Sequence, residues 1–244
     1  MKGFILAAGL GSRLKPWTDS HPKALVPVDG VPMLQRIVEK MFAAGITDIS
    51  VNVHHFADQI VSFIHSKGWN LHISDESGQL LETGGALLKA APFLEGDQPI
   101  LVHNADILSN ADFRALRKDH IESSSTATLL VSDRESSRKL IFDSHMRLKG
   151  WHNLSTGCFR PDGFTLSSGD SEWAFSGIYM VSPSLFPEMR SGGWEGRFSI
   201  MDFFLASCGS LDFKGIADPK LKLLDIGKPD ALHRASEFLR KIDC

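Results

Sequence analysis

Hydrophobic positions in the first half of the chain alternate between short continuous runs and runs spaced three or four residues apart. The continuous runs predict strands that are buried on both faces, and the spaced runs predict amphipathic helices. This alternation predicts an α/β fold with a doubly wound, mostly parallel sheet and helices on both faces. The predicted strands are 4–8, 49–53, 71–74, 100–103 and 126–132, and the predicted helices are 34–42, 56–66, 85–91 and 112–120.

The pattern changes after about residue 133. Two short apolar segments at 140–142 and 147–150 flank turn-forming residues and predict a hairpin. A polar stretch rich in glycine and serine then runs to residue 170. Beyond it the pattern predicts strands at 173–181 and 221–226 and helices at 200–207 and 229–242.

No repeat, low-complexity tract or clear linker interrupts the chain, so we expect one domain over residues 1–244. Residues 1–132 form its α/β half, residues 133–228 a smaller β-rich lobe with a late strand, and residues 229–244 a C-terminal helix. The length is ample for a hydrophobic core.

The composition is that of an ordinary soluble protein, with 43% hydrophobic and 23% charged residues. A net charge of −3, without a basic face or tail, predicts no nucleic-acid or membrane partner. Three widely spaced cysteines form neither a disulfide framework nor a zinc pattern, which favours a reducing compartment. The first apolar run is too short for a signal peptide, and no stretch approaches the ~20 apolar residues of a membrane span. We therefore expect a cytoplasmic protein.

The loop after the first predicted strand collects positive charge in this acidic protein. Between Gly11 and Lys23 it holds three basic residues and one acidic residue. Ligands of open α/β sheets bind at the carboxyl ends of the strands, which is where this loop lies. Gly9 and Gly11 let backbone N–H groups approach a phosphate, while Arg13 offers a planar fork of donors. The loop predicts a bound phosphate chain, against the alternative of a tight turn with solvated cations.

Two familiar phosphate-binding loops do not fit this segment. Residues 9–14 read GLGSRL, so the third glycine of a dinucleotide fingerprint is missing, and no acidic residue closes the second predicted strand. A P-loop, GxxxxGK followed by serine or threonine, is also absent from the sequence. A dinucleotide site and a P-loop site are therefore disfavoured.

The loop is part of a longer pattern. The sequence reads LAAGLGSRLKPWT at 6–18 and PKALVPV at 22–28, and continues with LETGGAL at 81–87 and HNADIL at 103–108. FSGIYMVSPSLF at 175–186 and LLDIGKPD at 223–230 complete it. These motifs resemble the sugar-1-phosphate nucleotidyltransferases, whose signature opens with LAAGxGxRLxPxT and PKxLxPV. Within that family the chain is most similar to the N-acetylmuramate-1-phosphate uridylyltransferase type of cell-wall recycling.

The resemblance implies a Rossmann-like nucleotidyltransferase fold in which residues 1–132 bind the nucleotide and residues 133–228 supply a sugar-phosphate-binding lobe and a metal-binding strand. The implied reaction transfers a nucleoside monophosphate from a nucleoside triphosphate to a sugar 1-phosphate and releases pyrophosphate. UTP and N-acetylmuramate 1-phosphate are the expected substrates, and Mg²⁺ is the expected cofactor. These substrates are the expected partners of a monomer or homodimer.

The resemblance also implies roles for single residues. Asp106 and Asp225 offer hard oxygen ligands for Mg²⁺, although a lone aspartate in either place also suits a turn or cap. Gly84 and Gly85 are expected beneath the base but also suit a helix start, and Glu172 either binds a sugar hydroxyl or is solvated. The implied catalytic residues are Arg13 and Lys23; the nucleotide-binding residues are Leu6, Ala8, Gly9, Gly11, Glu82, Thr83, Gly84, Gly85 and Asn104; the sugar-phosphate-binding residues are Glu172 and Gly177; and the metal ligands are Asp106 and Asp225.

The chain departs from the family pattern at three places. Ala105 stands where many relatives have glycine, Lys228 ends a late motif that usually ends in threonine, and the second lobe lacks a Glu-Lys-Pro run found in many hexose-specific relatives. Lys228 either contacts an anionic sugar substituent or is a solvated residue at a helix start. The alternatives are a GTP- or CTP-dependent transferase for a heptose, mannose or other phosphorylated acceptor, a molybdopterin guanylyltransferase, and a catalytically silent nucleotide-binding regulator.

Overall fold

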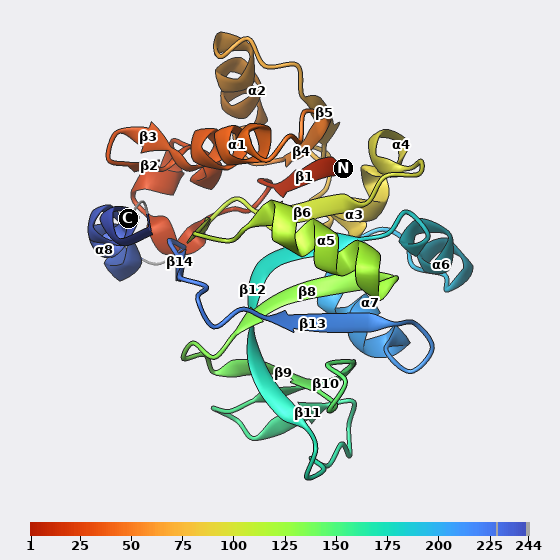
Figure 1. Cartoon of the computed structure of the whole chain (residues 1–244). Coiled ribbons are helices and arrows are strands. Elements are labelled where there is room, and N and C mark those ends of the chain that lie inside the picture. The colour runs from red at the N-terminus through yellow and green to blue at the C-terminus, as the bar shows by residue number, and fades with distance from the viewer. Residues whose placement is uncertain (228, 243–244) are drawn as a thin grey trace.

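The computed structural model describes residues 1–227 and 229–242 (Figure 1). The strands are β1 (Lys2–Leu6), β2 (Pro27–Val28), β3 (Val31–Pro32), β4 (Ile49–Val53), β5 (His72–Asp75), β6 (Ile100–Asn104), β7 (Ile107–Ser109), β8 (Ala127–Ser132), β9 (Arg138–Phe142), β10 (Leu148–Asn153), β11 (Cys158–Arg160), β12 (Ser171–Val181), β13 (Phe213–Ala217) and β14 (Leu223–Asp225). The helices are α1 (Met33–Ala43), α2 (Ala57–Ser66), α3 (Glu82–Lys89), α4 (Ala91–Leu94), α5 (Phe113–Ser123), α6 (Leu185–Ser191), α7 (Ile200–Ser207) and α8 (Pro229–Ile242).

A ten-stranded sheet runs through the molecule in the order β11-β10-β9-β12-β6-β1-β4-β5, with β8 and β13 joined to it through β12. In the first half β6, β1, β4 and β5 are parallel neighbours, with Phe4 between Ser50 and Val102 in register. The predicted α/β fold with a mostly parallel central sheet is confirmed.

Two hydrophobic cores cover the two faces of this sheet. Successive strand residues point to opposite faces, and Ile5 and Leu101 belong to one core while Phe4 and Val102 belong to the other. Buried residues of α1, α2, α5 and α8 complete the first core, and those of α3, α4, α6 and α7 complete the second. This burial on both faces explains the continuous apolar run at residues 4–6 of β1.

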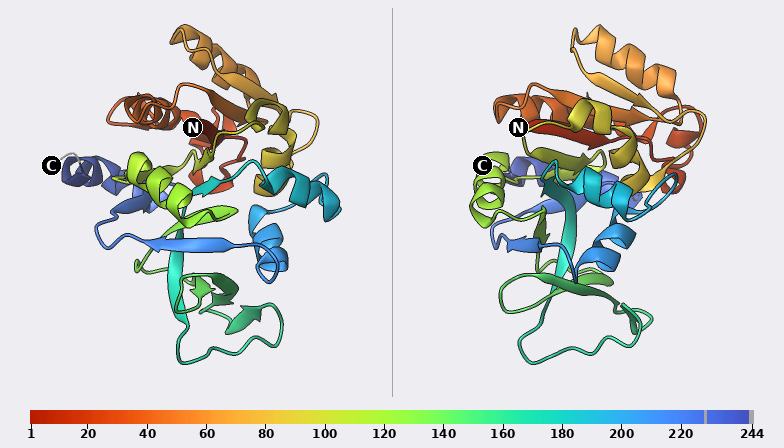
Figure 2. Two further views of the ribbon diagram at one scale, coloured as in Figure 1. Left: turned by 45° about the vertical axis from the view of Figure 1, so that its right-hand side comes forward. Right: turned by 90° about the vertical axis from the view of Figure 1, so that its right-hand side faces the viewer.

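The long strand β12 departs from the parallel order. It lies antiparallel between β6 and β8, so that Tyr179 pairs with Val102 on one side and with Leu129 on the other. The strand β8, expected as the next member of the parallel run, is separated from β6 and is parallel only to β13. The other end of β12 pairs with β9 through Trp173 and Leu140. β12 thereby carries the sheet into the second lobe, formed by β9, β10, β11 and the start of β12 (Figure 2).

Most elements expected from the pattern are present, with differences at their ends. The strand Ile49–Val53 and the helix Ile200–Ser207 have their predicted bounds, and the predicted hairpin forms as β9 and β10. The first strand ends at Leu6 rather than residue 8, and α3 begins at Glu82 rather than residue 85. The pattern does not predict β7, β13 or α6. No helix in the described residues is both long and apolar enough to cross a membrane.

The last elements of the chain return to its first half. β14 and β7 form a separate antiparallel pair, and α8 packs beside β2, β7 and β14 (Figure 1). Ala231, Ala235 and Leu239 form the buried face of α8. This return brings Asp225 to the segment that directly follows β6.

Candidate active site

A buried asparagine holds the loop after β1. The side-chain oxygen of Asn52, in β4, accepts hydrogen bonds from the backbone N–H groups of Ala7 (2.6 Å) and Ala8 (3.3 Å). Gly11 follows in the left-handed region (φ 63°), and a Cβ there would lie 2.9 Å from the Cβ of Lys23. Glycine is therefore required where the loop packs on the segment that carries Lys23.

A buried carboxylate links this loop to the facing wall. Glu76 is fully buried, and one of its oxygens accepts a hydrogen bond from the Asn52 amide (2.7 Å). The other oxygen accepts a hydrogen bond from the backbone N–H of Leu81 (2.9 Å), just before α3. A buried carboxylate needs such partners, because it loses its hydration. One chain of hydrogen bonds thus fixes the first loop and the start of α3 relative to each other.

The start of α3 forms the facing wall and is tied to the segment before α7. Arg197 forms an ion pair with Glu82, with 2.7 Å between Nη2 and Oε1. The Thr83 hydroxyl oxygen accepts a hydrogen bond from the backbone N–H of Ile200 (2.9 Å). Glu82 has a left-handed backbone (φ 60°), a strained conformation for a residue other than glycine.

Gly84 and Gly85 are buried in α3. A Cβ at Gly84 would lie 2.4 Å from the Phe198 ring, and one at Gly85 would lie 2.1 Å from the carbonyl oxygen of Gly196. The two glycines therefore let α3 pack closely on residues 196–200. The structure gives them this packing role and does not place them on the cavity described next, where the base was expected above them.

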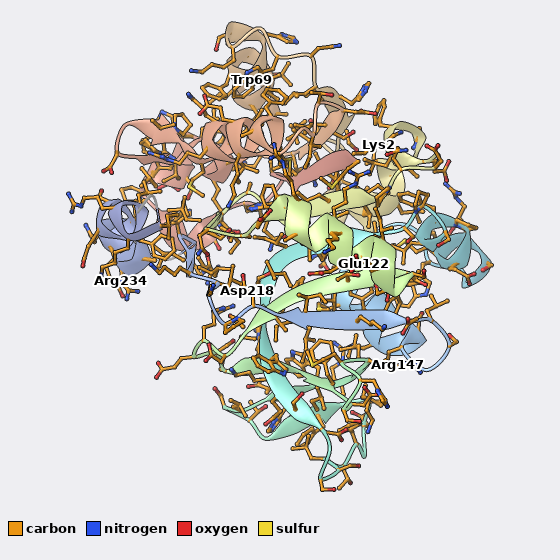
Figure 3. The ribbon with its side chains drawn as sticks, viewed as in Figure 1. Lys2, Trp69, Glu122, Arg147, Asp218 and Arg234 are labelled. Carbon is orange, nitrogen blue, oxygen red and sulfur yellow. The ribbon has the colours of Figure 1, made fainter. Side chains whose placement is uncertain are left out.

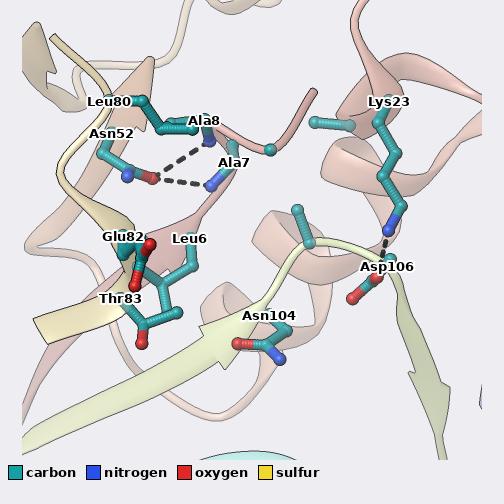
Figure 4. Close-up of a pocket in the computed structure, with 13 residues that line it drawn as sticks. Leu6, Ala7, Ala8, Lys23, Asn52, Leu80, Glu82, Thr83, Asn104 and Asp106 are labelled. Atoms are coloured by element: carbon teal, nitrogen blue, oxygen red, sulfur yellow. Dashed lines mark hydrogen bonds and ion pairs between the residues drawn. The ribbon is translucent and has the colours of Figure 1, made fainter. Parts of the chain in front are cut away.

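A cavity of about 230 Å³ lies between the two walls (Figure 4). Glu82 and Thr83 lie across it from Lys23 and Asp106, whose side chains form an ion pair (Figure 4). Asn104, at the end of β6, lies between these two pairs of residues (Figure 4). Residues expected to bind the nucleotide that line this cavity are Leu6, Ala8, Gly9, Glu82, Thr83 and Asn104.

Two basic and two acidic side chains meet near Gly227. Pairing of β14 with β7 sets Asp225 opposite Ile107, the residue after Asp106, and the backbone N–H of Ile226 donates a hydrogen bond to the carbonyl oxygen of Asp106 (2.9 Å). A Cβ at Gly227 would lie 2.8 Å from Oδ1 of Asp225 and 2.8 Å from Nζ of Lys23. The same position lies 3.0 Å from Nη2 of Arg13. Residues from the first loop, from the end of β6 and from the end of β14 are therefore brought to one point.

A second cavity of about 770 Å³ extends from this point into the second lobe. Arg13 and Asp225 line one part of it, and Trp151 and Phe175 contribute aromatic surface. A surplus of positive charge in a cleft attracts anionic ligands. Its basic lining residues are Arg13, Arg134, Arg138, Lys139 and Arg160, and its acidic lining residues are Glu135, Asp202 and Asp225.

The two residues expected at the sugar have different surroundings. Gly177 has a φ of 77°, and a Cβ there would lie 2.7 Å from the amide nitrogen of Asn104. The space that Gly177 leaves is therefore filled by Asn104. Glu172 forms a hydrogen-bonded pair with His152 (2.6 Å), and neither residue lines the two cavities. The structure does not bring Glu172 to the other predicted site residues. Its carboxylate is bonded to His152 of β10, within the second lobe.

Comparison with known proteins identifies the family. The sequence profile described as nucleotidyl transferase matches residues 2–242. The chain belongs to the nucleotidyl transferase family.

Curated relatives of this transferase agree on the class of reaction, and a solved structure shares its fold. N-acetylmuramate alpha-1-phosphate uridylyltransferases of Caulobacter vibrioides and Neisseria meningitidis are 29% and 32% identical to it, over 93% and 79% of this chain and 92% and 80% of theirs. The mannose-1-phosphate guanyltransferase of Hypocrea jecorina is 32% identical over 57% of this chain and 39% of its own. A Bacillus anthracis structure assigned as a glucose-1-phosphate thymidylyltransferase, solved with sucrose, superposes with a TM-score of 0.79 at 22% identity, over 98% of this chain and 95% of that one. The chain is a sugar-1-phosphate nucleotidyltransferase, as its motifs predict.

The carboxylates of the transferase fit a divalent cation that binds together with substrate. Within the described residues, no three acidic, histidine or cysteine side chains gather as a ready metal cage. Asp106 and Asp225 offer two hard oxygen ligands from neighbouring segments of the chain. Mg²⁺ is usually bound in this way, by one or two carboxylates with waters and substrate phosphates. The donor set therefore suits Mg²⁺.

Sequence reasoning missed four residues that build this site. Asn52 interrupts the apolar strand ISVNV, and that polar position was its only signal. Glu76 and Arg134 lie in no motif, so nothing in the sequence singled them out. Gly227 belongs to the LLDIGKPD motif, although its closeness to Lys23 required the structure. Lys228, expected either to contact an anionic substituent or to be solvated, lies outside the described residues.

Proposed function

We propose that this transferase moves the uridylyl group of UTP to N-acetylmuramate 1-phosphate, giving the UDP-sugar and pyrophosphate, with Mg²⁺ as cofactor. The observation that carries the proposal is the convergence of Arg13, Lys23, Asp106 and Asp225 between two cavities. The smaller cavity would hold the nucleotide, and the larger one would hold the sugar phosphate. Their meeting point is then where the two substrates react.

The reaction requires alignment and neutralisation of charge. A phosphate oxygen of the sugar 1-phosphate attacks the α-phosphorus of UTP, and the bond from that phosphorus to the oxygen of the leaving pyrophosphate breaks. No general base is needed, because the attacking phosphate is already ionised. Lys23 would stabilise charge on the α-phosphate, and Arg13 would stabilise charge on the leaving phosphates. Asp106 and Asp225 would hold Mg²⁺, which supplies further positive charge for the phosphates.

The charge of the larger cavity favours an acidic sugar. Five basic and three acidic residues line it. The positive surplus remains when Arg13 and Asp225, at the reaction centre, are left out. N-acetylmuramate carries a lactyl carboxylate in addition to its 1-phosphate, so it offers a second anionic group to this lining. The uridylyltransferase relatives, which match most of this chain, support the same choice of acceptor. A place in cell-wall recycling and in the cytoplasm would follow from that acceptor.

The test is pyrophosphate release with UTP, GTP, CTP, ATP and dTTP against sugar 1-phosphates that include N-acetylmuramate 1-phosphate. We expect release with UTP and that acceptor, and loss of release when Mg²⁺ is chelated. Asp106→Asn and Asp225→Asn should each lower kcat about 100- to 1000-fold, since each removes a preorganised charge. The exposed Asp58→Asn, in α2, is the matched control and should keep full activity.

The guanyltransferase relatives favour a second candidate, GTP with a neutral hexose 1-phosphate. Release with GTP and mannose 1-phosphate, and none with UTP and N-acetylmuramate 1-phosphate, would replace the proposed substrates and keep the reaction. Binding of a nucleoside triphosphate without release across the whole panel would instead identify a silent regulator.

A further inference from the structure

Arg134 lies at the border between the reaction centre and the second lobe. It follows β8 and lines the larger cavity together with Arg13 and Asp225. Its Nη2 donates a hydrogen bond to the carbonyl oxygen of Phe175 in β12 (2.9 Å). The backbone carbonyl oxygen of Arg134 accepts a hydrogen bond from the Lys139 ammonium (2.8 Å). The guanidinium is thus anchored to β12, and the backbone of Arg134 is bonded to Lys139 of β9.

One donor of this guanidinium lacks an acceptor. The Nε of Arg134 is buried, and it makes no hydrogen bond within the described residues. A buried donor without a partner costs about 1–3 kcal/mol, so such a group persists where a ligand or water completes it. Burial lowers the pKa of Arg134, and the nearby Asp225 opposes this shift. Arginine nevertheless stays protonated in proteins, so the cavity keeps a fixed positive charge here.

The other second-lobe cations on this cavity have different surroundings. The guanidinium of Arg160 is exposed and forms an ion pair with Asp202 (2.8 Å). Lys139 is directed to the carbonyl oxygen of Arg134 (2.8 Å), and Arg138 is exposed to solvent. Arg134 alone combines partial burial, anchoring to β12 and closeness to Asp225 among the described cations of the second lobe.

An anionic acceptor needs such a charge on its own side of the reaction centre. The sugar phosphate must approach a triphosphate that is also negatively charged. Lys23 lines the smaller cavity, and Arg13, from the same loop, reaches the larger cavity at the point where the two cavities meet. We propose that Arg134 binds the phosphate of the sugar 1-phosphate and holds it for attack, an inference that rests on the proposed function.

The test compares Arg134→Gln, Arg134→Lys and the wild type in steady-state kinetics with each substrate varied in turn. Arg134→Gln should raise the KM of the sugar 1-phosphate about 10- to 100-fold, the loss expected for a charged hydrogen bond, while the KM of the nucleoside triphosphate changes less than about twofold. Arg134→Lys keeps the charge without the planar fork, so its KM for the sugar 1-phosphate should lie between those of the wild type and Arg134→Gln. Arg147→Gln, an exposed ion-pair arginine outside the cavity, should match the wild type.

Binding gives a readout that does not depend on turnover. The sugar 1-phosphate that the wild type uses, or N-acetylmuramate 1-phosphate if the wild type is silent, should raise the unfolding temperature of the wild type and of Arg147→Gln but not of Arg134→Gln. Equal protection of all three would overturn the inference. So would a shift in the Mg²⁺ concentration for half-maximal rate with an unchanged acceptor KM, which would make Arg134 a positioning residue for Asp225. A wild type that is silent in turnover contradicts only the proposed function.

Discussion

Asn52 ties the loop after β1 to the facing wall of the smaller cavity. It accepts hydrogen bonds from Ala7 and Ala8 and donates one to Glu76. Asn52→Ala would leave these buried groups without partners, and each costs about 1–3 kcal/mol. We expect the free energy of unfolding to fall by about 2–4 kcal/mol and the KM of the nucleoside triphosphate to rise. Urea unfolding and steady-state kinetics measure the two effects.

Asn153→Ala is the matched control for this prediction. Asn153 ends β10 in the second lobe and accepts one turn hydrogen bond, from the backbone N–H of Ser155 (3.0 Å). Its loss should cost less than about 1 kcal/mol and leave the KM of the nucleotide unchanged. If Asn52→Ala kept the wild-type KM, the loop after β1 would not depend on this asparagine.

The sequence could predict site residues where local chemistry or a family motif marks them. Arg13 and Lys23 were marked because positive charge is concentrated in one loop of an acidic chain. Glu76 carries no such mark, because its function is to bind Asn52 and Leu81, and the pairing of distant residues is a property of the fold. The motif containing Gly84 and Gly85 was recognised, but the neighbours that require glycine there became visible only in the structure.

At the scale of elements, a buried histidine fixes α5 to the sheet. His120 is 3% exposed, its Nδ1 lies 2.8 Å from the Thr128 hydroxyl of β8, and its Nε2 lies 3.1 Å from the Ser182 hydroxyl after β12. Burial lowers its pKa from 6.5 to about 4. The unfolded chain therefore binds a proton that the folded state resists. This contribution to stability is present above pH 6.5 and is lost as the pH falls toward 4.

We predict a difference in the pH dependence of stability between the wild type and His120→Gln. Between pH 6.5 and 4 the free energy of unfolding of the wild type should fall faster than that of His120→Gln, by up to about 1.4 kcal/mol per pH unit. His103, whose pKa burial lowers to about 3, titrates in both proteins and cancels in the comparison. Urea unfolding at several pH values provides the curves. Parallel curves would mean that His120 is protonated in the folded state at no cost.

Helices were predictable where apolar residues recur every three or four positions, as in α1 and α7. Strands were predictable from short runs of mainly apolar residues, as in β4. The pattern could not reveal that β12 enters the sheet antiparallel between β6 and β8, because strand order is set by packing across the whole sheet. β7 is only three residues long and forms through pairing with β14, more than 100 positions later in the sequence, so local periodicity gives no sign of it.

At the scale of the whole molecule, β12 makes the two halves one cooperative structure. Its last residues pair with β6 and β8, and its first residues pair with β9. Both halves therefore contribute strands that pair with β12. If β9 unfolds, the first residues of β12 lose their pairing partner. We expect a destabilised second lobe to lower the stability of the first half by the same amount.

Two tryptophans can report on the halves separately. Trp69 packs on Phe42 and Phe63 in the first half, and Trp151 lies in β10 of the second lobe (Figure 3 labels Trp69). Two reporter proteins would each keep one of these tryptophans and replace the other four with phenylalanine. Urea unfolding of both, followed by fluorescence, should give coincident midpoints if the molecule unfolds as a unit.

Leu140→Ala, placed in each reporter protein, tests this coupling. Leu140 is 1% exposed in β9 and faces Trp173 across the pair with β12, so its truncation should cost about 2–5 kcal/mol. Both reporters should shift to lower urea together. Leu154→Ala, at a second-lobe position that is 49% exposed, should shift neither by more than about 0.5 kcal/mol. A shift seen only by Trp151 would mean that the second lobe unfolds on its own, and that β12 does not transmit its loss to the first half.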